Sequence, residues 1–582
     1  MAPAARAIAN SDVVFLAWRY DEKIDQCLGF RIERKKDGAK KWEPLPAWVG
    51  WEGDKNAGWV AKDTAVWPVQ KFTWRDFYVD HETTYVYRIT PMIGPSTNLT
   101  PDTAHAVVTQ PVTVTSKHGD IGVCFNRGIV STQSLTRSVP KAAKGGPDHA
   151  VLQKRIDQPG DPLRNRLAGD ILPTLTGFLD QPGQFHAALY ELDDVELLKS
   201  LLGLKERLHI ILSNTGPDDS RNAPARQTLH DAGIDITDRM LANDANQIGH
   251  NKFVVHVDEA GTPQAVITGS TNWSDTGLCT QVNNVIRINS GEVAAKYLDY
   301  WKRLKSDDAQ QAPKLRDFDR AGQASDVVSG TELKIWFSPN TKATKKPTTP
   351  KEVPVDLAQV SSIISGAQQA ILFLIFQPGS PSVLEMIAAA KDKNPKLFVH
   401  GAISDENTVE MYHRNAEISE TYAVGVGGIP DEFGYWEQEM YRFSNAVIHD
   451  KVVVVDPFSA QPTVITGSHN LGYKASYSND ENMVIARGNP SIAAAYATHI
   501  MDVYDHYRWR YRLTQQAKEG KLDQAWQGLK KSAAWQANYF GATSHAREEI
   551  VFWNPDAAAP EAVKTKKKTT KPVVTTGPKL HV

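Results

Sequence analysis

Two segments of the chain, residues 250–283 and 449–481, repeat one pattern of polar residues. Each begins with His-x-Lys ahead of an apolar run, and each continues to Gly-Ser-x-Asn at the end of a second apolar run. The two histidines, His250 and His449, are 449 − 250 = 199 residues apart. Chance duplication of the whole pattern is improbable. The repeat therefore predicts two copies of one domain that build a single site together.

The apolar run after each His-x-Lys, residues 253–255 and 452–455, predicts a buried strand. Side chains two residues apart project from the same side of a strand, so each histidine and its lysine face the same way. The glycine of Gly-Ser-x-Asn allows close approach to a ligand, and the serine and asparagine supply neutral hydrogen-bond donors. These donors and two lysines suit a tetrahedral oxyanion such as a phosphate. The predicted site consists of His250, Lys252, Ser270, Asn272, His449, Lys451, Ser468 and Asn470.

A structural role is the alternative for any one of these histidines. A single histidine on an apolar strand more often completes a core than it acts in catalysis, and His256 is interpreted in this way. The occurrence of the full pattern twice favours a site over a core.

The two patterns resemble those of the phospholipase D superfamily, whose signature is HxKxxxxD followed by GSxN. The second copy fits in full, with Asp456 as the acid, whereas in the first copy the acid comes one residue late, at Asp258. Family members also carry a glutamate after GSxN that orients a catalytic histidine. Glu481 stands at that position in the second half and Asn283 in the first. The resemblance covers about residues 165–510.

The resemblance implies that His250 attacks phosphorus and forms a phosphohistidine, while His449 protonates the leaving oxygen and then activates water. The lysines would hold the phosphoryl oxygens, the asparagines would stabilise the developing charge, and the serines would support orientation. An alcohol in place of water would give transfer instead of hydrolysis. The chain has no CxxC or HExxH motif and no carboxylates at metal-ligand spacing, so we expect neither a metal nor a cofactor.

Three functional classes fit the sequence: a phosphodiesterase acting on phospholipid, a nuclease with the same chemistry, and a catalytically inactive binding protein. The intact motifs in both halves count against the third class. The net charge of −2 and the pI near 6.8 provide no general basic field for nucleic acid. We therefore expect phospholipid or another phosphodiester as substrate, with a membrane surface as a further contact and nucleic acid as the alternative.

Residues 427–443 combine aromatic and acidic side chains just before the second motif. Carboxylates there would repel a polynucleotide, whereas aromatic rings attract a quaternary ammonium group. This favours a choline or ethanolamine headgroup, and packing of the same rings in a lid is the alternative. The predicted substrate contacts are Phe433, Tyr435 and Trp436.

Strands alternate with helical patterns in both halves, which predicts two repeated α/β lobes with a pseudo-twofold phospholipase D-like fold behind an all-β sandwich. The alternating residues Tyr85, Tyr87 and Ile89 make the N-terminal part resemble a fibronectin type III module. The expected divisions are a sandwich (1–115), a connector (116–164), a first lobe (165–325), a second lobe (326–515) and a C-terminal extension with a basic tail (516–582).

The cellular setting is inferred from what the sequence lacks. Three widely spaced cysteines argue against a disulfide framework, and no stretch has the length of a signal peptide core or a membrane span. We therefore expect a cytoplasmic protein, with signal-free export left open. Because both half-sites lie in one chain, a monomer is expected.

Overall fold

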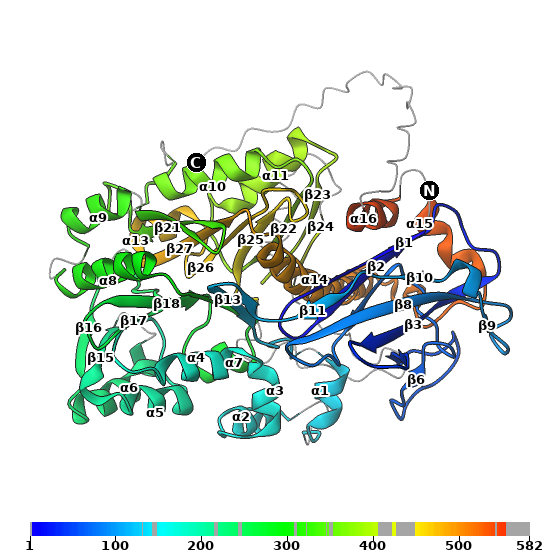
Figure 1. Ribbon diagram of the computed structural model, residues 1–582, viewed down its shortest axis with the longest axis horizontal. Helices are drawn as coiled ribbons and strands as arrows, with labels where there is room; N and C mark the ends of the chain where they lie inside the picture. Colours follow the sequence, from blue (N-terminus) through cyan, green and yellow to red (C-terminus); the bar gives the residue numbers. More distant parts are fainter. Residues whose placement is uncertain are drawn as a thin grey trace.

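The chain folds into an N-terminal pair of sheets and two lobes that are each built on a larger sheet, as a computed structural model shows (Figure 1). The structure describes residues 3–130, 132–142, 148–214, 219–241, 247–307, 311–321, 323–344, 346–348, 353–404, 422–425, 448–541 and 544–554.

The N-terminal region contains two antiparallel sheets that share one apolar core. Tyr85, Tyr87 and Ile89 alternate along the central strand and are all buried, as their period of two predicts. The Tyr87 hydroxyl joins the sheets by donating to Asp76 at 3.0 Å. This arrangement agrees with a sandwich, and its fibronectin type III character remains a prediction. One sheet comprises β1 (Ala4–Ala9), β2 (Val14–Arg19) and β7 (Thr73–Asp76), and the other β3 (Cys27–Lys36), β4 (Glu43–Pro44), β8 (Thr83–Ile93), β9 (Thr100–Pro101), β10 (Val107–Val108) and β11 (Val112–Val114).

Each lobe contains an eight-stranded sheet, and the two sheets have the same strand order. In the first lobe the order is β12-β13-β19-β18-β17-β14-β15-β16, and in the second it is β20-β21-β27-β26-β25-β22-β23-β24. One topology thus occurs twice, as a duplicated domain requires. The first set is β12 (Lys117–His118), β13 (Ile121–Phe125), β14 (Gln184–Leu189), β15 (Leu208–Ser213), β16 (Asp235–Arg239), β17 (Lys252–Val257), β18 (Pro263–Gly269) and β19 (Asn284–Ile288). The second is β20 (Gln323–Val328), β21 (Thr331–Ser338), β22 (Ala370–Ile375), β23 (Phe398–Ile403), β24 (Tyr422–Gly425), β25 (Lys451–Val455), β26 (Thr463–Gly467) and β27 (Glu481–Arg487).

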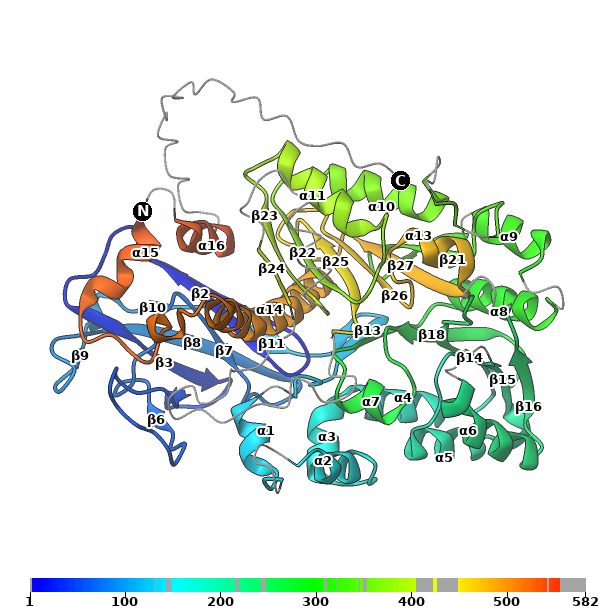
Figure 2. The same ribbon diagram turned by 180° about the vertical axis from the view of Figure 1, so that it is seen from behind.

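Helices cover both faces of each sheet (Figures 1 and 2). Helices α8 (Gly291–Lys305) and α14 (Pro490–Lys518) pack in a core that the two sheets share. The outer face of the first sheet is covered by α4 (Ile171–Leu179), α5 (Val195–Leu202) and α6 (Asp219–Asp231), and that of the second by α10 (Val355–Ser365) and α11 (Val383–Lys393).

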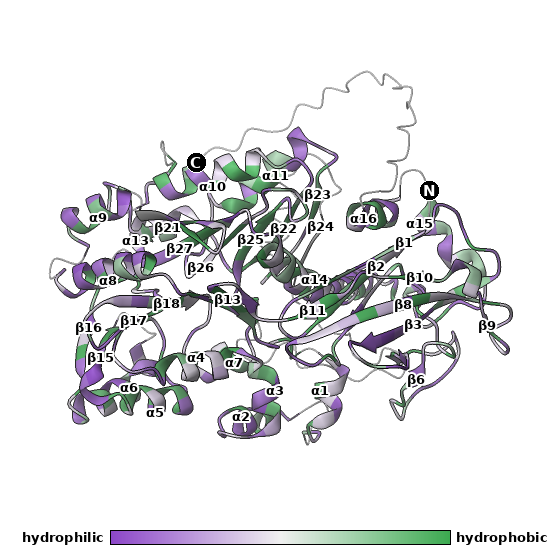
Figure 3. Cartoon of the chain, viewed as in Figure 1, coloured by the Kyte–Doolittle hydropathy of each residue, from purple (hydrophilic) through white to green (hydrophobic). Residues whose placement is uncertain are grey.

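Strand β22 is buried on both faces, since alternate residues enter the shared core and the outer core. This explains its unbroken apolar sequence, which is green along its length in Figure 3.

The expected connector, residues 116–164, is corrected by the structure. Strand β13 pairs antiparallel with β19 over its whole length, so the first lobe begins with β12 at Lys117. Every second residue of β13 is apolar and enters the shared core, which explains why this short segment joins the sheet. The helices that follow pack into the outer core of the same lobe; they are α1 (Gln133–Ser138), α2 (His149–Ile156) and α3 (Pro162–Ala168).

The C-terminal extension is also more than a tail, because its described part returns to the N-terminal sheets. Trp535 Nε1 donates to the Cys27 carbonyl at 2.9 Å, and Ile550 is buried in the N-terminal core. Helix α16 (His545–Trp553) packs on β2 (Figure 1), and α15 (Ala537–Phe540) packs against α16 and against Phe72 of the N-terminal core. The basic tail lies outside the described residues.

Among the described helices, none combines the length and the apolar character needed to cross a bilayer.

Candidate active site

The two motif histidines face each other where the lobes meet. The ring centroids of His250 and His449 are 6.4 Å apart, and both side chains are at most 4% exposed. Each lies just before its strand, β17 or β25, instead of within the ladder as the sequence suggested. Two reciprocal backbone bridges hold these approaches, Gly249 to Asp480 and Val282 to Ile448. The two halves of the pattern therefore build one site.

Each histidine receives its partner from the opposite lobe. Nδ1 of His250 lies 3.3 Å from Oε2 of Glu481, and Nδ1 of His449 lies 3.0 Å from Oδ1 of Asn283. The carboxylate that follows the second GSxN therefore serves the first histidine, and the amide that follows the first GSxN serves the second. Sequence order alone gave no sign of this exchange.

The Asn283 amide fixes the tautomer of His449. Its Nδ2 donates to the Gly277 carbonyl at 2.9 Å, so its Oδ1 must face the imidazole. An oxygen acceptor at Nδ1 requires a proton on Nδ1, which leaves Nε2 of His449 directed away from Asn283. Nδ1 of His250 faces the Glu481 carboxylate at ion-pair distance, and a proton on that nitrogen is favoured because the carboxylate can only accept.

The glycines of the two Gly-Ser-x-Asn motifs are required by close backbone contacts. A Cβ atom at Gly269 would lie 2.3 Å from the Asn284 carbonyl oxygen, and one at Gly467 would lie 2.4 Å from that of Asn482. Both glycines have positive φ, +147° and +135°. Each glycine thus allows β18 or β26 to end against the neighbouring strand and to turn the Ser-x-Asn segment into the site.

The lysines are buried beside the histidines. Lys252 Nζ donates to the His250 carbonyl at 2.9 Å, and Lys451 Nζ donates in the same way to the His449 carbonyl. Burial lowers the pKa of Lys252 to about 7, although Glu481 and Glu191 oppose the shift. Burial and the neighbouring Lys252 ammonium hold the pKa of Lys451 well below its usual range. A bound anion would stabilise the charged form of both lysines.

The same environment keeps the histidines neutral at pH 7. Burial and the Lys252 ammonium lower the pKa of His250 to about 4, and burial with Lys451 holds the pKa of His449 well below its usual range. Burial alone would raise the pKa of Glu481, but His250, His469 and Asn479 outweigh it and lower that pKa. A neutral imidazole beside an ionised carboxylate is the state that a nucleophilic histidine needs.

Two aromatic residues of the site were missed from the sequence. The Tyr190 ring lies 4.8 Å from the His250 ring and 4.9 Å from Lys252 Nζ. Phe376 stands in the same relation to His449 and Lys451, at 4.8 Å from each. Both directly follow corresponding strands, β14 and β22, so an alignment of the two halves would have revealed them.

The serines and asparagines of the motifs differ in what they contact. Ser270 and Ser468 accept the backbone N–H groups of Asn284 and Asn482, each at 3.0 Å, and so tie the motif to the next strand. Asn272 Nδ2 donates to Glu191 at 2.7 Å.

Unused acceptors remain on two motif side chains. Among the described residues, the buried Oδ1 atoms of Asn272 and Asn470 receive no hydrogen bond. Such unused capacity suits a water or a substrate hydroxyl.

The motif acids lie away from the histidines. Asp456 accepts the backbone N–H groups of Gln368, Gln369 and Ala370 at 2.7 to 3.2 Å, and Asp258 accepts those of the β17–β18 turn. Their role is to support the sheet. The late position of Asp258 has a structural cause, because β17 has six residues before its acid whereas β25 has five, and the pairing of β17 with β18 shifts register between His256 and Val257. One extra residue in the first half is accommodated in this irregularity, as in a β-bulge.

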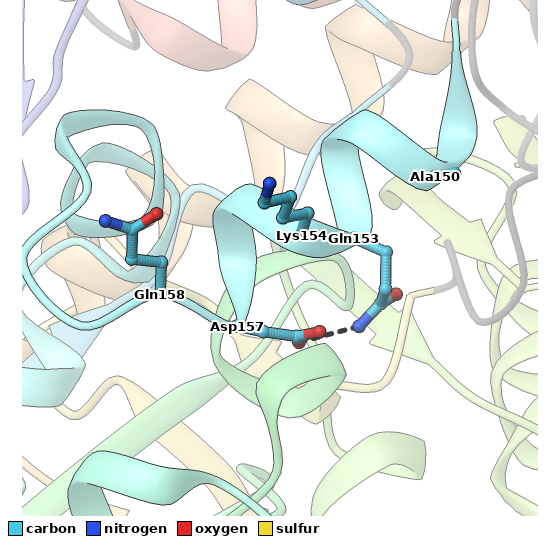
Figure 4. Close-up of a pocket in the computed structure, with 5 residues that line it drawn as sticks. All are labelled: Ala150, Gln153, Lys154, Asp157 and Gln158. Atoms are coloured by element: carbon cyan, nitrogen blue, oxygen red, sulfur yellow. Dashed lines mark hydrogen bonds between the residues drawn. The ribbon is translucent and has the colours of Figure 1, made fainter.

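Phe433, Tyr435 and Trp436 lie outside the described residues. A surface hollow of about 530 Å³ is lined by α2 and the residues after it, at Ala150, Gln153, Lys154, Asp157 and Gln158 (Figure 4). It contains neither histidine. Within the described ranges, no group of three or more His, Cys, Asp or Glu side chains could hold a metal ion.

Comparisons with known families agree with this geometry. The family model described as "Cardiolipin synthase, PLD-like domain" matches residues 183–305 and 360–503, which include both histidines and both Gly-Ser-x-Asn motifs. The two segments make up less than half of the chain. No curated protein matches the chain.

Three solved structures show partial similarity to this chain. A phosphatidylserine synthase from Haemophilus influenzae is 11% identical, with 62% of this chain and 94% of that one covered and a TM-score of 0.42. A polyphosphate kinase from Porphyromonas gingivalis is 10% identical over 56% of this chain, with a TM-score of 0.35, and the match spans 46% of the kinase. Nuc from Salmonella typhimurium, a phospholipase D family member, is 20% identical over 31% of this chain and 95% of its own, with a TM-score of 0.22.

Proposed function

We propose that the phospholipase D-like domain carried by the two lobes is a phosphodiesterase that cleaves a phospholipid headgroup through a phosphohistidine on His250. One observation carries the proposal: two buried, neutral histidines face each other at 6.4 Å, each held at Nδ1 by the opposite lobe and each flanked by a buried lysine. This arrangement leaves both Nε2 atoms available to a phosphate between them.

In the first step, Nε2 of His250 attacks phosphorus, and the bond from phosphorus to the leaving oxygen breaks. The negative charge of a bound phosphodiester favours the imidazolium form of His449, which carries a proton on Nε2 as well as on Nδ1. This imidazolium gives its Nε2 proton to that oxygen, so the alcohol leaves neutral and His449 becomes neutral. The ammonium groups of Lys252 and Lys451 face the non-bridging oxygens and stabilise the negative charge that develops there.

In the second step, neutral His449 takes a proton from water, and the water oxygen attacks phosphorus. The phosphorus–nitrogen bond then breaks, and His250 returns to its starting state. An alcohol that takes the place of water gives transfer of the phosphatidyl group by the same steps.

The two Nδ1 partners support this division of labour. The Glu481 carboxylate stabilises the positive charge that His250 acquires when it forms a bond to phosphorus. The Asn283 amide is neutral, so it stabilises a His449 imidazolium less and leaves that group a stronger acid. The reverse assignment would place the carboxylate beside the acid and weaken it.

A headgroup is favoured over a polynucleotide by the charges on the first-lobe side. Glu191 accepts from Asn272, and Arg221 lies 3.7 Å from Glu191, 2.7 Å from Asp193 and 3.2 Å from Asp275. Three carboxylates thus surround one guanidinium group. Phosphates that flank a scissile diester in DNA would be repelled there, whereas a zwitterionic headgroup would not.

The test is a parallel assay of purified protein on labelled phosphatidylcholine vesicles and on DNA, with a chelator present. Release of choline, or transfer to an added alcohol, is expected. Faster cleavage of DNA than of any lipid would assign the protein to the nuclease class, and cleavage of neither would leave only a binding role.

Removal of divalent metal is expected to leave activity unchanged, because two lysines already supply positive charge at the phosphoryl oxygens. The measurement is the initial rate before and after treatment with excess EDTA, on the soluble diester bis(p-nitrophenyl) phosphate. This substrate avoids any effect of calcium on vesicle binding. A complete loss that added metal restores would contradict the mechanism.

Binding of a phosphodiester is expected to weaken as pH rises above about 7. Lys252, with a pKa of about 7, is charged below that pH and neutral above it, and a bound anion raises its pKa. Phosphodiester binding above about pH 7 is then coupled to the uptake of a proton by Lys252. The affinity for the phosphodiester therefore falls by up to about tenfold for each unit that the pH rises. The Ki of a dialkyl phosphate, whose own charge is constant from about pH 6 to 9, measures this effect. Lys252→Arg is charged over this whole pH range, so its Ki should change less with pH than that of the wild type. A wild-type Ki that does not change with pH would refute the role of Lys252 in this effect.

The aromatic segment is proposed to contact the headgroup. Trp436→Ala with Tyr435→Ala is expected to lower the rate on phosphatidylcholine and spare bis(p-nitrophenyl) phosphate, because only the lipid presents a quaternary ammonium. Initial rates on the two substrates provide the comparison. Equal losses would instead indicate packing of the rings in a lid.

A further inference from the structure

A second carboxylate is buried beside the site, at the residue between His449 and Lys451. Asp450 is fully buried, and its Oδ1 accepts from Ser270 Oγ at 3.0 Å and from Asn284 Nδ2 at 2.5 Å. Its Oδ2 lies 2.7 Å from Nε2 of His499, on α14. Asp450 thus accepts two hydrogen bonds at one oxygen and faces a histidine nitrogen with the other.

The orientation of Asn284 supports this reading of Asp450. Asn284 Oδ1 accepts from Thr466 Oγ1 at 2.9 Å and from the Tyr496 hydroxyl at 3.1 Å. Its Nδ2 must therefore point toward Asp450, which can only be an acceptor.

Ser270 connects Asp450 to the partner of His449. Ser270 Oγ lies 2.8 Å from Asn283 Oδ1 and 3.0 Å from Asp450 Oδ1, but it has one proton to donate. A carboxylate is a stronger acceptor than an amide, so the proton goes to Asp450. Asn283 Oδ1 then remains free to accept Nδ1–H of His449, 3.0 Å away.

Around His250, the carboxylate and the amide occupy each other's positions: an amide stands after the histidine, and a carboxylate contacts the imidazole. Asn251 replaces Asp450, and its Nδ2 donates to Tyr300 at 3.1 Å, where the other half has His499. The carboxylate of that half is Glu481, directly at the imidazole. Each histidine thus has one buried carboxylate in its surroundings, adjacent for His250 and beyond Asn283 and Ser270 for His449.

We propose that Asp450, held by His499, is a positioning residue for His449, acting through Ser270 and Asn283. It supplies the negative charge that stabilises the imidazolium form needed for leaving-group protonation. The charged and titratable groups that face His449 itself are Lys451, Lys252 and His250, all of which oppose that form when charged. Asp450 offsets them. The inference rests on the proposed function, in which His449 is the general acid.

The test compares two leaving groups. The first substrate is the alkyl diester that the wild type cleaves, either phosphatidylcholine or DNA, and its leaving oxygen needs a proton. The second is bis(p-nitrophenyl) phosphate, whose p-nitrophenolate leaves without one. Asp450→Asn is expected to lower kcat on the alkyl diester by about 10- to 10³-fold and to change the p-nitrophenolate burst little. Loss of the negative charge disfavours the imidazolium, so the basic limb of the kcat profile should move to lower pH.

Asn251→Ala, at the matching position beside His250, serves as the control. It is expected to change the rates on both substrates by the same factor and to leave the basic limb of the kcat–pH profile in place. Should Asp450→Asn fail to fold, His499→Gln keeps the carboxylate with a neutral donor and should move the basic limb in the same direction by less. Equal losses on both substrates with an unmoved pH profile would overturn the positioning role alone. A wild type inactive on every diester would overturn the proposed function as well.

Discussion

Replacement of His250 by alanine is expected to lower turnover of any phosphodiester by about 10⁴-fold or more and to abolish the covalent intermediate. His250 is the residue whose Nδ1 meets the Glu481 carboxylate, and no other described group can attack phosphorus from that position. The measurement is steady-state turnover together with the burst of p-nitrophenolate from bis(p-nitrophenyl) phosphate. Neither product nor burst should be seen.

His256→Gln is the matched control for this variant. His256 lies on β17, the strand that His250 precedes, and is buried. Its Nε2 lies 2.7 Å from the Pro182 carbonyl, which a glutamine amide can also reach, and its ring stacks on Phe185. Its activity should equal that of the wild type. A rate near the wild type in His250→Ala would remove the basis for a site made of two halves.

Replacement of His449 by alanine is expected to lower turnover by about 10²- to 10⁴-fold and to trap the phosphoenzyme. Without this histidine, an alkoxide leaves unprotonated and water is not activated, so an alkyl diester should scarcely react. A p-nitrophenyl ester needs no proton for the first step. It should therefore give a burst that is stoichiometric with enzyme, followed by slow hydrolysis.

The trapped species should be labile to acid and stable to base, as a phosphoramidate is. If His449→Ala shows no burst, His449 has a role in the first step beyond protonation, and the assignment of acid and nucleophile falls. Steady turnover of the nitrophenyl ester at the wild-type rate would show that His449 does not activate water.

Much of the site follows from the sequence, because its motifs occupy corresponding places in two copies of one topology. The alternating burial expected of strands, together with the repeated spacing from His-x-Lys to Gly-Ser-x-Asn, was enough to predict that the eight motif residues lie in one region. Even the late acid Asp258 has a local signal, since the first half has one more residue than the second between its lysine and its serine.

The partner exchange could not be predicted in this way. Glu481 and Asn283 follow their own motifs in sequence, but pseudo-twofold pairing brings each to the other lobe's histidine. The pattern therefore showed that the halves are chemically unequal without showing which histidine has the carboxylate. Asp450 was overlooked for a related reason, because its contacts with Ser270 and Asn284 also cross between lobes.

Domain limits were the least predictable part of the fold. The segment 117–125 looks like one more short strand after a β-sandwich, and only its pairing with β19 assigns it to the first lobe. In the same way, Trp535 and Ile550 read as parts of a C-terminal extension. They join the N-terminal core because the chain returns to it over more than 500 residues, which no local pattern encodes.

The central claim is that a single histidine, supplied by the first half, carries the phosphoryl group. Mass spectrometry of peptides from His449→Ala, after reaction with bis(p-nitrophenyl) phosphate and digestion at alkaline pH, tests it most directly. The account predicts one modified peptide, with the phosphoryl group on His250 and in amounts close to those of the enzyme. A modification on any other residue, or a full p-nitrophenolate burst without a phosphohistidine, would contradict it.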